Sequence, residues 1–140
     1  MTDKKGKILV ADDEEGIRYF LERYFQIKFP EFGVEFFGNG SLLENRVNGI
    51  IGNDNAENVR LILTDNNMPF VSGSEIIERH AFRLGRDYKI PVFLMSGMMD
   101  ERKSETALRN GAYACIRKPF DFVELEQQIK QALGYESVRE

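Results

Sequence analysis

The stretch LILTDNNMPF, residues 61–70, runs from apolar residues directly into an aspartate. The segment RLILT (60–64) has the length and composition of a strand that is buried on both faces. A carboxylate is costly to remove from water, so a buried strand that ends on Asp65 needs a partner for that charge. The segments before and after this stretch indicate what the partner is.

Four further apolar runs are typical of strands, namely KILVA (7–11), VEFF (34–37), PVFLM (91–95) and YACI (113–116). Helical patterns alternate with them: GIRYFLERYFQIKF (16–29), a segment after Ser41, and segments that begin near Ser74, Asp100 and Asp121. Strands that are apolar on both faces and alternate with helices form parallel sheets covered by helices on both sides. Because crossovers are right-handed, an open doubly wound α/β sheet is predicted.

Each helix is predicted to bury one face. The residues expected on these faces are Ile17, Phe20, Leu21, Tyr24 and Phe25 in the first helix, Leu42, Leu43 and Val47 in the second, and Phe122, Leu125, Ile129 and Leu133 in the last. The polar stretch NGIIGNDNAEN (48–58) is predicted to be a loop, because Gly and Asn favour turns. Residues 49–58 are either a partner-specific loop or, as we favour, a tolerated surface insertion, since long loops add little closure cost.

Length and composition limit the class of protein. With 140 residues and 42% hydrophobic content, the chain fits one domain. No apolar run approaches the roughly 20 residues that cross a bilayer, and the N-terminus lacks a signal-peptide pattern, so a cytoplasmic protein with no membrane partner is predicted. The formal net charge of -4 argues against direct nucleic-acid binding, which needs clustered Lys and Arg.

Polar residues follow four of the predicted strands, and the carboxyl ends of parallel strands meet at one edge of a sheet. These residues are Asp12, Asp13, Asp65, Ser96 and Lys118. Each alone has an ordinary explanation as a helix cap or a turn residue. Together, however, the acids concentrate negative charge that one lysine does not offset. Carboxylate oxygens in excess are typical of a hard-cation site, and Mg²⁺ is the predicted ion.

A carboxylate beside Mg²⁺, with a hydroxyl and an ammonium directed to the same place, suits the transfer of a phosphoryl group. Asp65 is then the nucleophile. The metal and Lys118 would stabilise charge on the phosphoryl oxygens, and the Ser96 hydroxyl would donate a hydrogen bond to one of them. A rigid strand that ends on Asp65 would hold the nucleophile in place.

Four motifs, VADDEE (10–15), LTDNNMPFVSG (63–73), FLMSG (93–97) and RKPF (117–120), together resemble the response regulator receiver domain of two-component signalling. The resemblance extends from about residue 7 to residue 133 of a single domain that spans residues 1–140, leaving a short tail at 134–140. It implies a flavodoxin-like (βα)5 fold with five parallel strands in the order 2-1-3-4-5. The match covers nearly the whole chain.

The resemblance also implies a role for each residue of the site. Asp65 is the phosphoacceptor, Ser96 the switch hydroxyl and Lys118 the phosphoryl contact. The implied Mg²⁺ ligands are Asp12, Asp13, Asp65 and the backbone carbonyl of Asn67. The family further implies a cis bond between Lys118 and Pro119, which the proline makes possible.

The function that the resemblance implies is signalling and not metabolic catalysis. The phosphoryl donor is a phosphohistidine on a sensor histidine kinase or phosphotransfer domain, and the domain catalyses its own phosphorylation and dephosphorylation. The switched face, formed by strands four and five and the last two helices, reports to a downstream protein that the sequence does not identify. A phosphorylation-dependent homodimer is a further family expectation.

Cys115, Tyr113 and His80 do not belong to the predicted acid site. Receivers usually carry Tyr or Phe three residues before the lysine, where this chain has Cys115, its single cysteine. Tyr113 lies two residues earlier and is expected to share a strand face with Cys115, so it either substitutes for the missing ring or serves as ordinary packing. The single histidine, His80, is expected on the surface of a helix, far from the acids.

Two other classes of protein compete with the receiver interpretation. A metal-dependent phosphohydrolase with an aspartyl intermediate favours a nucleophile after strand one, a second aspartate two residues later and a substrate cap. Here Asp12 is followed by Asp13 and Glu14, and no cap is evident. A receiver fold used only as a scaffold would be expected to lack some of the acids or the lysine, and none is lost.

Overall fold

A parallel sheet of five strands forms the centre of the computed structural model, which describes residues 4–53 and 58–135. The strand order is β2-β1-β3-β4-β5, as predicted. The strands are β1 (Gly6–Ala11), β2 (Phe32–Phe37), β3 (Val59–Asp65), β4 (Val92–Ser96) and β5 (Ala114–Arg117). Strand order reverses between β1 and β3, so a site at their carboxyl ends lies where doubly wound sheets bind ligands.

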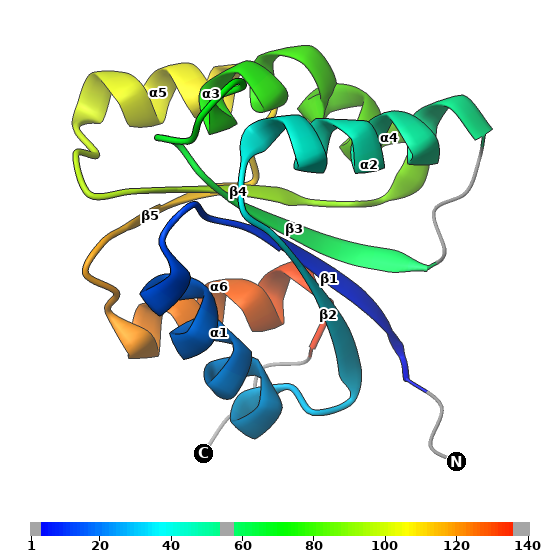
Figure 1. The fold of residues 1–140 in the computed structure, drawn as a ribbon, viewed down its shortest axis with the longest axis vertical. Coiled ribbons are helices and arrows are strands. Elements are labelled where there is room, and N and C mark those ends of the chain that lie inside the picture. The colour runs from blue at the N-terminus through cyan, green and yellow to red at the C-terminus, as the bar shows by residue number, and fades with distance from the viewer. Residues whose placement is uncertain (1–3, 54–57, 136–140) are drawn as a thin grey trace.

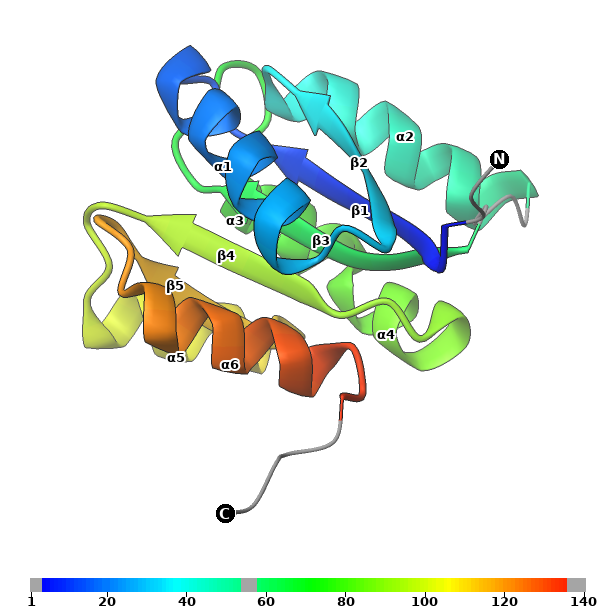
Figure 2. The same ribbon diagram turned by 90° about the horizontal axis from the view of Figure 1, so that it is seen from below.

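Helices cover both faces of the sheet (Figures 1 and 2). Helices α1 (Glu15–Lys28) and α6 (Phe122–Ala132) lie on one face. The opposite face carries α2 (Gly40–Asn53), α3 (Gly73–Ile76), the π-helical turn η1 (Ile77–Ala81), α4 (Phe82–Tyr88) and α5 (Glu101–Arg109). Within the described residues no helix is both long and apolar enough to cross a membrane.

Each face of the sheet has its own hydrophobic core. The core under α1 and α6 includes the buried side chains of Leu21, Phe25, Leu125, Ile129 and Phe93. The core under the other helices is formed by Leu43, Val47, Ile50, Leu84 and Leu94, among others. Burial of each large apolar side chain contributes about 1.5–3 kcal/mol, so the two layers hold the sheet rigidly between them.

The predicted loop at residues 48–58 is wrong for its first half, because α2 continues to Asn53. Ile50 is fully buried and extends the buried stripe of Leu43 and Val47 by one more turn. Packing of this residue outweighs the weak helix propensity of Gly49 and the neighbouring Asn residues. Residues 54–57 lie outside the described part of the chain.

Three residues expected in the core are largely exposed, and one of them is Phe20 of α1, at 36%. Leu42 is 50% exposed, because its place in the first turn of α2 turns it away from the face that carries Leu43 and Val47. Phe122 is 49% exposed at the first residue of α6, where its ring contacts Phe20 at a centroid distance of 5.2 Å. Helices α5 and α6 begin where predicted, next to Asp100 and Asp121. Each of these side chains caps its helix by accepting hydrogen bonds from backbone N–H groups of the first turn.

The single helix predicted to begin near Ser74 consists of α3, η1 and α4 in succession. It begins at Gly73, one residue before Ser74, because Ser72 as the N-cap and Glu75 form a capping box. His80 lies in η1, and the expectation that it is a surface residue is wrong. Its side chain is 15% exposed, and its Nε2 lies 2.8 Å from the Glu44 carboxylate of α2.

Candidate functional site

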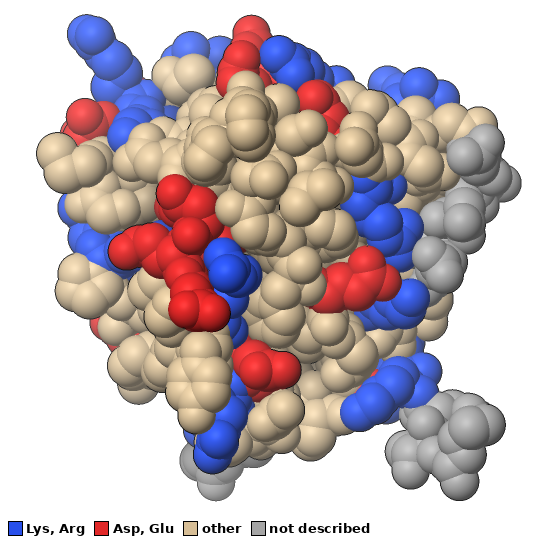
Figure 3. Space-filling model, viewed as in Figure 1, with Lys and Arg blue, Asp and Glu red and all other residues tan. Residues whose placement is uncertain are grey.

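Three aspartates meet at the carboxyl ends of β1 and β3. These strands are adjacent, with Ala11 paired to Thr64, so the residues that follow lie side by side. Carboxylate oxygens of Asp12, Asp13 and Asp65 all lie within 4.8 Å of one another. Asp12 is fully buried and Asp65 nearly so, whereas Asp13 is exposed. Figure 3 shows acidic side chains gathered over the end of β1 and the start of α1.

Lys118 reaches this cluster from the end of β5. Its backbone N–H donates to the Ser96 carbonyl (3.0 Å), and its bond to Pro119 is cis, as predicted. The ammonium nitrogen lies 2.6 Å from Asp12 Oδ2 and 3.1 Å from Asp65 Oδ1. Its side chain is only 12% exposed, so the charges interact with little screening by solvent.

The surroundings of Asp65 disfavour its ionised form. Burial, and then repulsion from Asp12, raise the pKa of Asp65 from 3.8 to about 6, although Lys118 opposes the change. Burial alone would lower the pKa of Lys118, but its contacts with Asp12 and Asp65 outweigh burial and hold that pKa above its ordinary value. One ammonium therefore does not offset the buried negative charge.

The donor atoms of the cluster fit a hard divalent cation. The three side chains offer only carboxylate oxygens, which are the ligands that Mg²⁺ and Ca²⁺ prefer. An added cation would also relieve the repulsion that raises the pKa of Asp65. The acid cluster predicted from the sequence is thus present, with a donor set suited to such an ion.

An open cleft of about 500 Å³ lies over these residues. Its lining includes the predicted site residues Asp13, Asp65, Asn67 and Lys118, together with Glu14, Ile17, Gly97 and Pro119. Ser96 is fully buried at the end of β4, and its Oγ accepts a hydrogen bond from the Met98 N–H (3.1 Å). Its neighbour Gly97 lines the cleft, so Ser96 lies beside the space where a group could bind.

The loop between β3 and α3 depends on two glycines that sequence reasoning did not single out as site residues. A Cβ on Gly73 would lie 2.3 Å from the Asp65 carbonyl oxygen, and a Cβ on Gly40 would lie 1.7 Å from the Val71 carbonyl oxygen. The Asn66 side chain accepts hydrogen bonds from the Ser74 N–H (3.1 Å) and hydroxyl (2.6 Å). Gly73 ends the motif LTDNNMPFVSG (63–73). Its close approach to the backbone of Asp65 explains why glycine stands there.

Arg18 is a further residue that the sequence did not indicate. Its Nη1 donates to the backbone carbonyl of Asp12 at 2.8 Å. It lies six positions after Asp12, at the end of the first turn of α1, so its contact depends on the direction in which α1 leaves the sheet.

Replacing Gly73 with alanine is expected to lower the free energy of unfolding by about 2 kcal/mol, because the new methyl group overlaps backbone and cannot be relieved by a side-chain rotation. Urea unfolding measures the loss. Gly85→Ala is the matched control, since a Cβ there meets no atom within 4 Å. Equal stability of the two variants would contradict the close approach at Gly73.

Cys115 occupies the position at which receivers usually carry Tyr or Phe, and its surroundings differ from those of Tyr113. Cys115 packs against the core under α2 to α5, with its Sγ 3.8 Å from the Ser104 carbonyl oxygen. The Tyr113 ring instead stacks on Phe93, which belongs to the opposite core. The expectation that Tyr113 shares a strand face with Cys115 is therefore wrong, because β5 begins only at Ala114 and strand alternation does not extend to Tyr113.

Comparisons with known proteins agree on one family. A family model described as "Response regulator receiver domain" matches residues 8–130. Regulatory protein AtoC of Escherichia coli (strain K12) is 26% identical over 134 residues, which cover 96% of this chain and 26% of AtoC. The transcriptional regulatory protein YkoG of Bacillus subtilis (strain 168) is 30% identical over 131 residues, covering 93% of this chain and 52% of YkoG. The chain thus spans about a quarter to a half of the length of these relatives.

Solved structures share the fold. The signal receiver domain of DNA binding response regulator protein (merR) from Colwellia psychrerythraea 34H matches with a TM-score of 0.77 and 21% identity, over 92% of this chain and 98% of that one. The family model covers most of the chain, and the fold and the acid cluster agree with it. The chain therefore belongs to the response regulator receiver domain family of two-component systems.

Proposed function

We propose that Asp65 accepts a phosphoryl group from a phosphohistidine in a Mg²⁺-dependent reaction, and that the change alters contacts with a downstream protein. The observation that carries the proposal is the position of the Asp65 carboxylate. It ends a rigid central strand, faces an open cleft, and lies within reach of Lys118 and two further aspartates. The donor is a sensor histidine kinase or a phosphotransfer domain.

In the proposed reaction an Asp65 carboxylate oxygen attacks phosphorus as the bond from phosphorus to the imidazole nitrogen breaks, and the electron pair of that bond stays with the imidazole. Asp65 must be ionised to attack, and a pKa of about 6 leaves it mostly ionised at neutral pH. Lys118 Nζ already lies 3.1 Å from Asp65 Oδ1, so it can donate to an oxygen of the arriving group.

Asp12, Asp13, Asp65 and the backbone carbonyl of Asn67 would hold Mg²⁺, which supplies positive charge for the phosphoryl oxygens. The Ser96 hydroxyl can turn from the Met98 amide to donate to one of those oxygens. Attack of water on phosphorus later breaks the bond to Asp65 and releases inorganic phosphate. Hydrolysis ends the signal, so the domain acts in signalling and not as a metabolic enzyme. The cytoplasm is its expected location.

Intact-protein mass spectrometry after incubation with acetyl phosphate tests the proposal. One phosphoryl adduct is expected in wild type with Mg²⁺, and none in Asp65→Asn or in the presence of a chelator. Asp87→Asn, an exposed substitution on α4, serves as the control and should form the adduct normally. A folded wild-type protein that forms no adduct with Mg²⁺ would favour the scaffold interpretation instead.

A further inference from the structure

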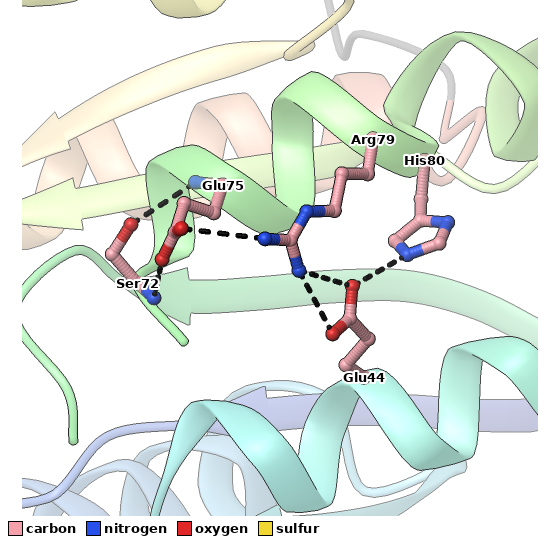
Figure 4. Close-up of polar contacts among 5 residues, drawn as sticks. All are labelled: Glu44, Ser72, Glu75, Arg79 and His80. Atoms are coloured by element: carbon pink, nitrogen blue, oxygen red, sulfur yellow. Dashed lines mark hydrogen bonds and ion pairs between the residues drawn. The ribbon is translucent and has the colours of Figure 1, made fainter. Parts of the chain in front are cut away.

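A group of charged residues away from the acid cleft connects α2 to the helix that follows the Asp65 loop (Figure 4). The Glu44 carboxylate of α2 accepts hydrogen bonds from Arg79 Nη1 at 3.0 Å to each of its oxygens. His80 Nε2 lies 2.8 Å from Glu44 Oε2. Glu44 is 17% exposed and His80 15% exposed, so solvent competes little for this carboxylate.

The pKa of Glu44 agrees with this arrangement. Burial alone would raise it, but hydrogen bonds from His80 and Arg79 outweigh burial and lower the pKa of Glu44 below its ordinary value. The carboxylate therefore stays ionised at neutral pH. Arg79 and His80 are consecutive residues of the wide turn η1, and both reach the same side chain. The site chemistry described above uses none of these three residues.

The same network continues to the cap of α3. Arg79 Nη2 lies 3.3 Å from Glu75 Oε2, and Glu75 Oε1 accepts from the Ser72 N–H at 2.9 Å. Ser72 Oγ in turn accepts from the Glu75 N–H at 3.1 Å. The next residue along the chain is Gly73, which packs directly on the Asp65 carbonyl.

A second connection runs through the start of α2. Gly40 lies one turn before Glu44, and its N–H donates to the Pro69 carbonyl at 3.4 Å. Gly40 also packs so closely on Val71 that a Cβ would meet the Val71 carbonyl. The loop at residues 66–72 is thus held between the first turn of α2 and the cap of α3, and Glu44 joins these two elements to each other.

We propose that Glu44, through Arg79 and His80, is a positioning residue that clamps the loop carrying Asn67 in the geometry needed for Mg²⁺. The inference rests on the proposed function, because that function assigns the Asn67 carbonyl to the metal. Mg²⁺ requires nearly ideal octahedral geometry with ligands at about 2.0–2.1 Å, so a small displacement of one carbonyl weakens binding. Glu44 never touches the metal or the phosphoryl group.

Isothermal titration calorimetry of Mg²⁺ into Glu44→Gln provides the test, since glutamine keeps the size but loses the charge that Arg79 and His80 share. We expect a 3- to 10-fold weaker Mg²⁺ affinity, partial recovery in Glu44→Asp, and a smaller loss in His80→Gln. With acetyl phosphate, Glu44→Gln should require more Mg²⁺ for half-maximal adduct formation, while the rate at saturating Mg²⁺ changes less than twofold.

A second substitution tests whether Glu44 acts only by stabilising the fold. This substitution lowers thermal stability but lies away from the contacts of Glu44 with Arg79 and His80. Ile129→Val removes a methyl group from the opposite core and should leave the Mg²⁺ affinity unchanged. Wild-type Mg²⁺ affinity in Glu44→Gln, or an equal loss in Ile129→Val, would overturn the inference. If wild type binds Mg²⁺ but forms no adduct, the proposed function fails and calorimetry still decides the role of Glu44. If wild type does not bind Mg²⁺, both fail.

Discussion

Replacing Lys118 with methionine is expected to lower the free energy of unfolding by about 3–5 kcal/mol at pH 7.5, the range seen when one partner of a buried ion pair is removed. The ammonium lies 2.6 Å from Asp12 and 3.1 Å from Asp65, and both carboxylates are almost completely buried. Without Lys118 their charges repel each other, and no other described residue forms an ion pair with either carboxylate. Urea unfolding in the presence of a chelator measures the loss.

The matched control for this variant is Lys130→Met. Lys130 also forms an ion pair, with Glu126 at 3.0 Å, but its side chain is 46% exposed, so its removal should cost less than about 0.5 kcal/mol. Saturating Mg²⁺ should restore more stability to Lys118→Met than it adds to wild type, because an added cation replaces the lost charge. A loss below about 1 kcal/mol would show that the acid cluster does not depend on the lysine.

Asp65→Asn should have the opposite effect and raise the free energy of unfolding at pH 7.5. The pKa of Asp65 is raised from 3.8 to about 6, so the folded protein keeps a proton that the unfolded chain releases between these values. The stabilisation from that proton is complete below pH 4 and is lost as pH rises through 6. A difference of about 2 pKa units corresponds to about 3 kcal/mol, which is the upper limit of the gain.

The expected stabilisation by Asp65→Asn is tested by measuring the free energy of unfolding of wild type and variant from pH 4 to pH 8, without divalent cations. The two curves should approach each other toward pH 4 and separate above pH 6, with the variant more stable. Asp87→Asn is the control, since Arg86 lowers the pKa of Asp87 and its removal should give no gain at any pH. A destabilised Asp65→Asn variant at pH 7.5 would mean that the attraction of Lys118 exceeds the combined cost of burial and of repulsion by Asp12.

The sheet and the acid cluster could be predicted because both depend on short-range patterns. Each strand is a short apolar run. Asp12 and Asp65 follow such a run directly, and Lys118 follows one after a single residue. Parallel strands then bring those residues to one edge without any knowledge of side-chain packing.

Features that depend on distant packing could not be predicted. Gly and Asn are weak helix formers and predict a loop at the end of α2, and only burial of Ile50 under the sheet reverses that preference. The burial of His80 cannot be predicted from local pattern, because its partner Glu44 lies 36 positions earlier in the chain. The orientation of the Ser96 hydroxyl likewise depends on the local path of the loop after β4.

Strand β4 connects the backbone of Ser96 to both hydrophobic cores. Its successive side chains are wedged into opposite layers: Leu94 joins the core that includes Ala107 of α5, whereas Phe93 joins the core that includes Leu125 of α6. Ser96 is the last residue of this strand, so any displacement of its backbone pulls on both layers at once. A binding partner that contacts only α5 and one that contacts only α6 would therefore sense the same event.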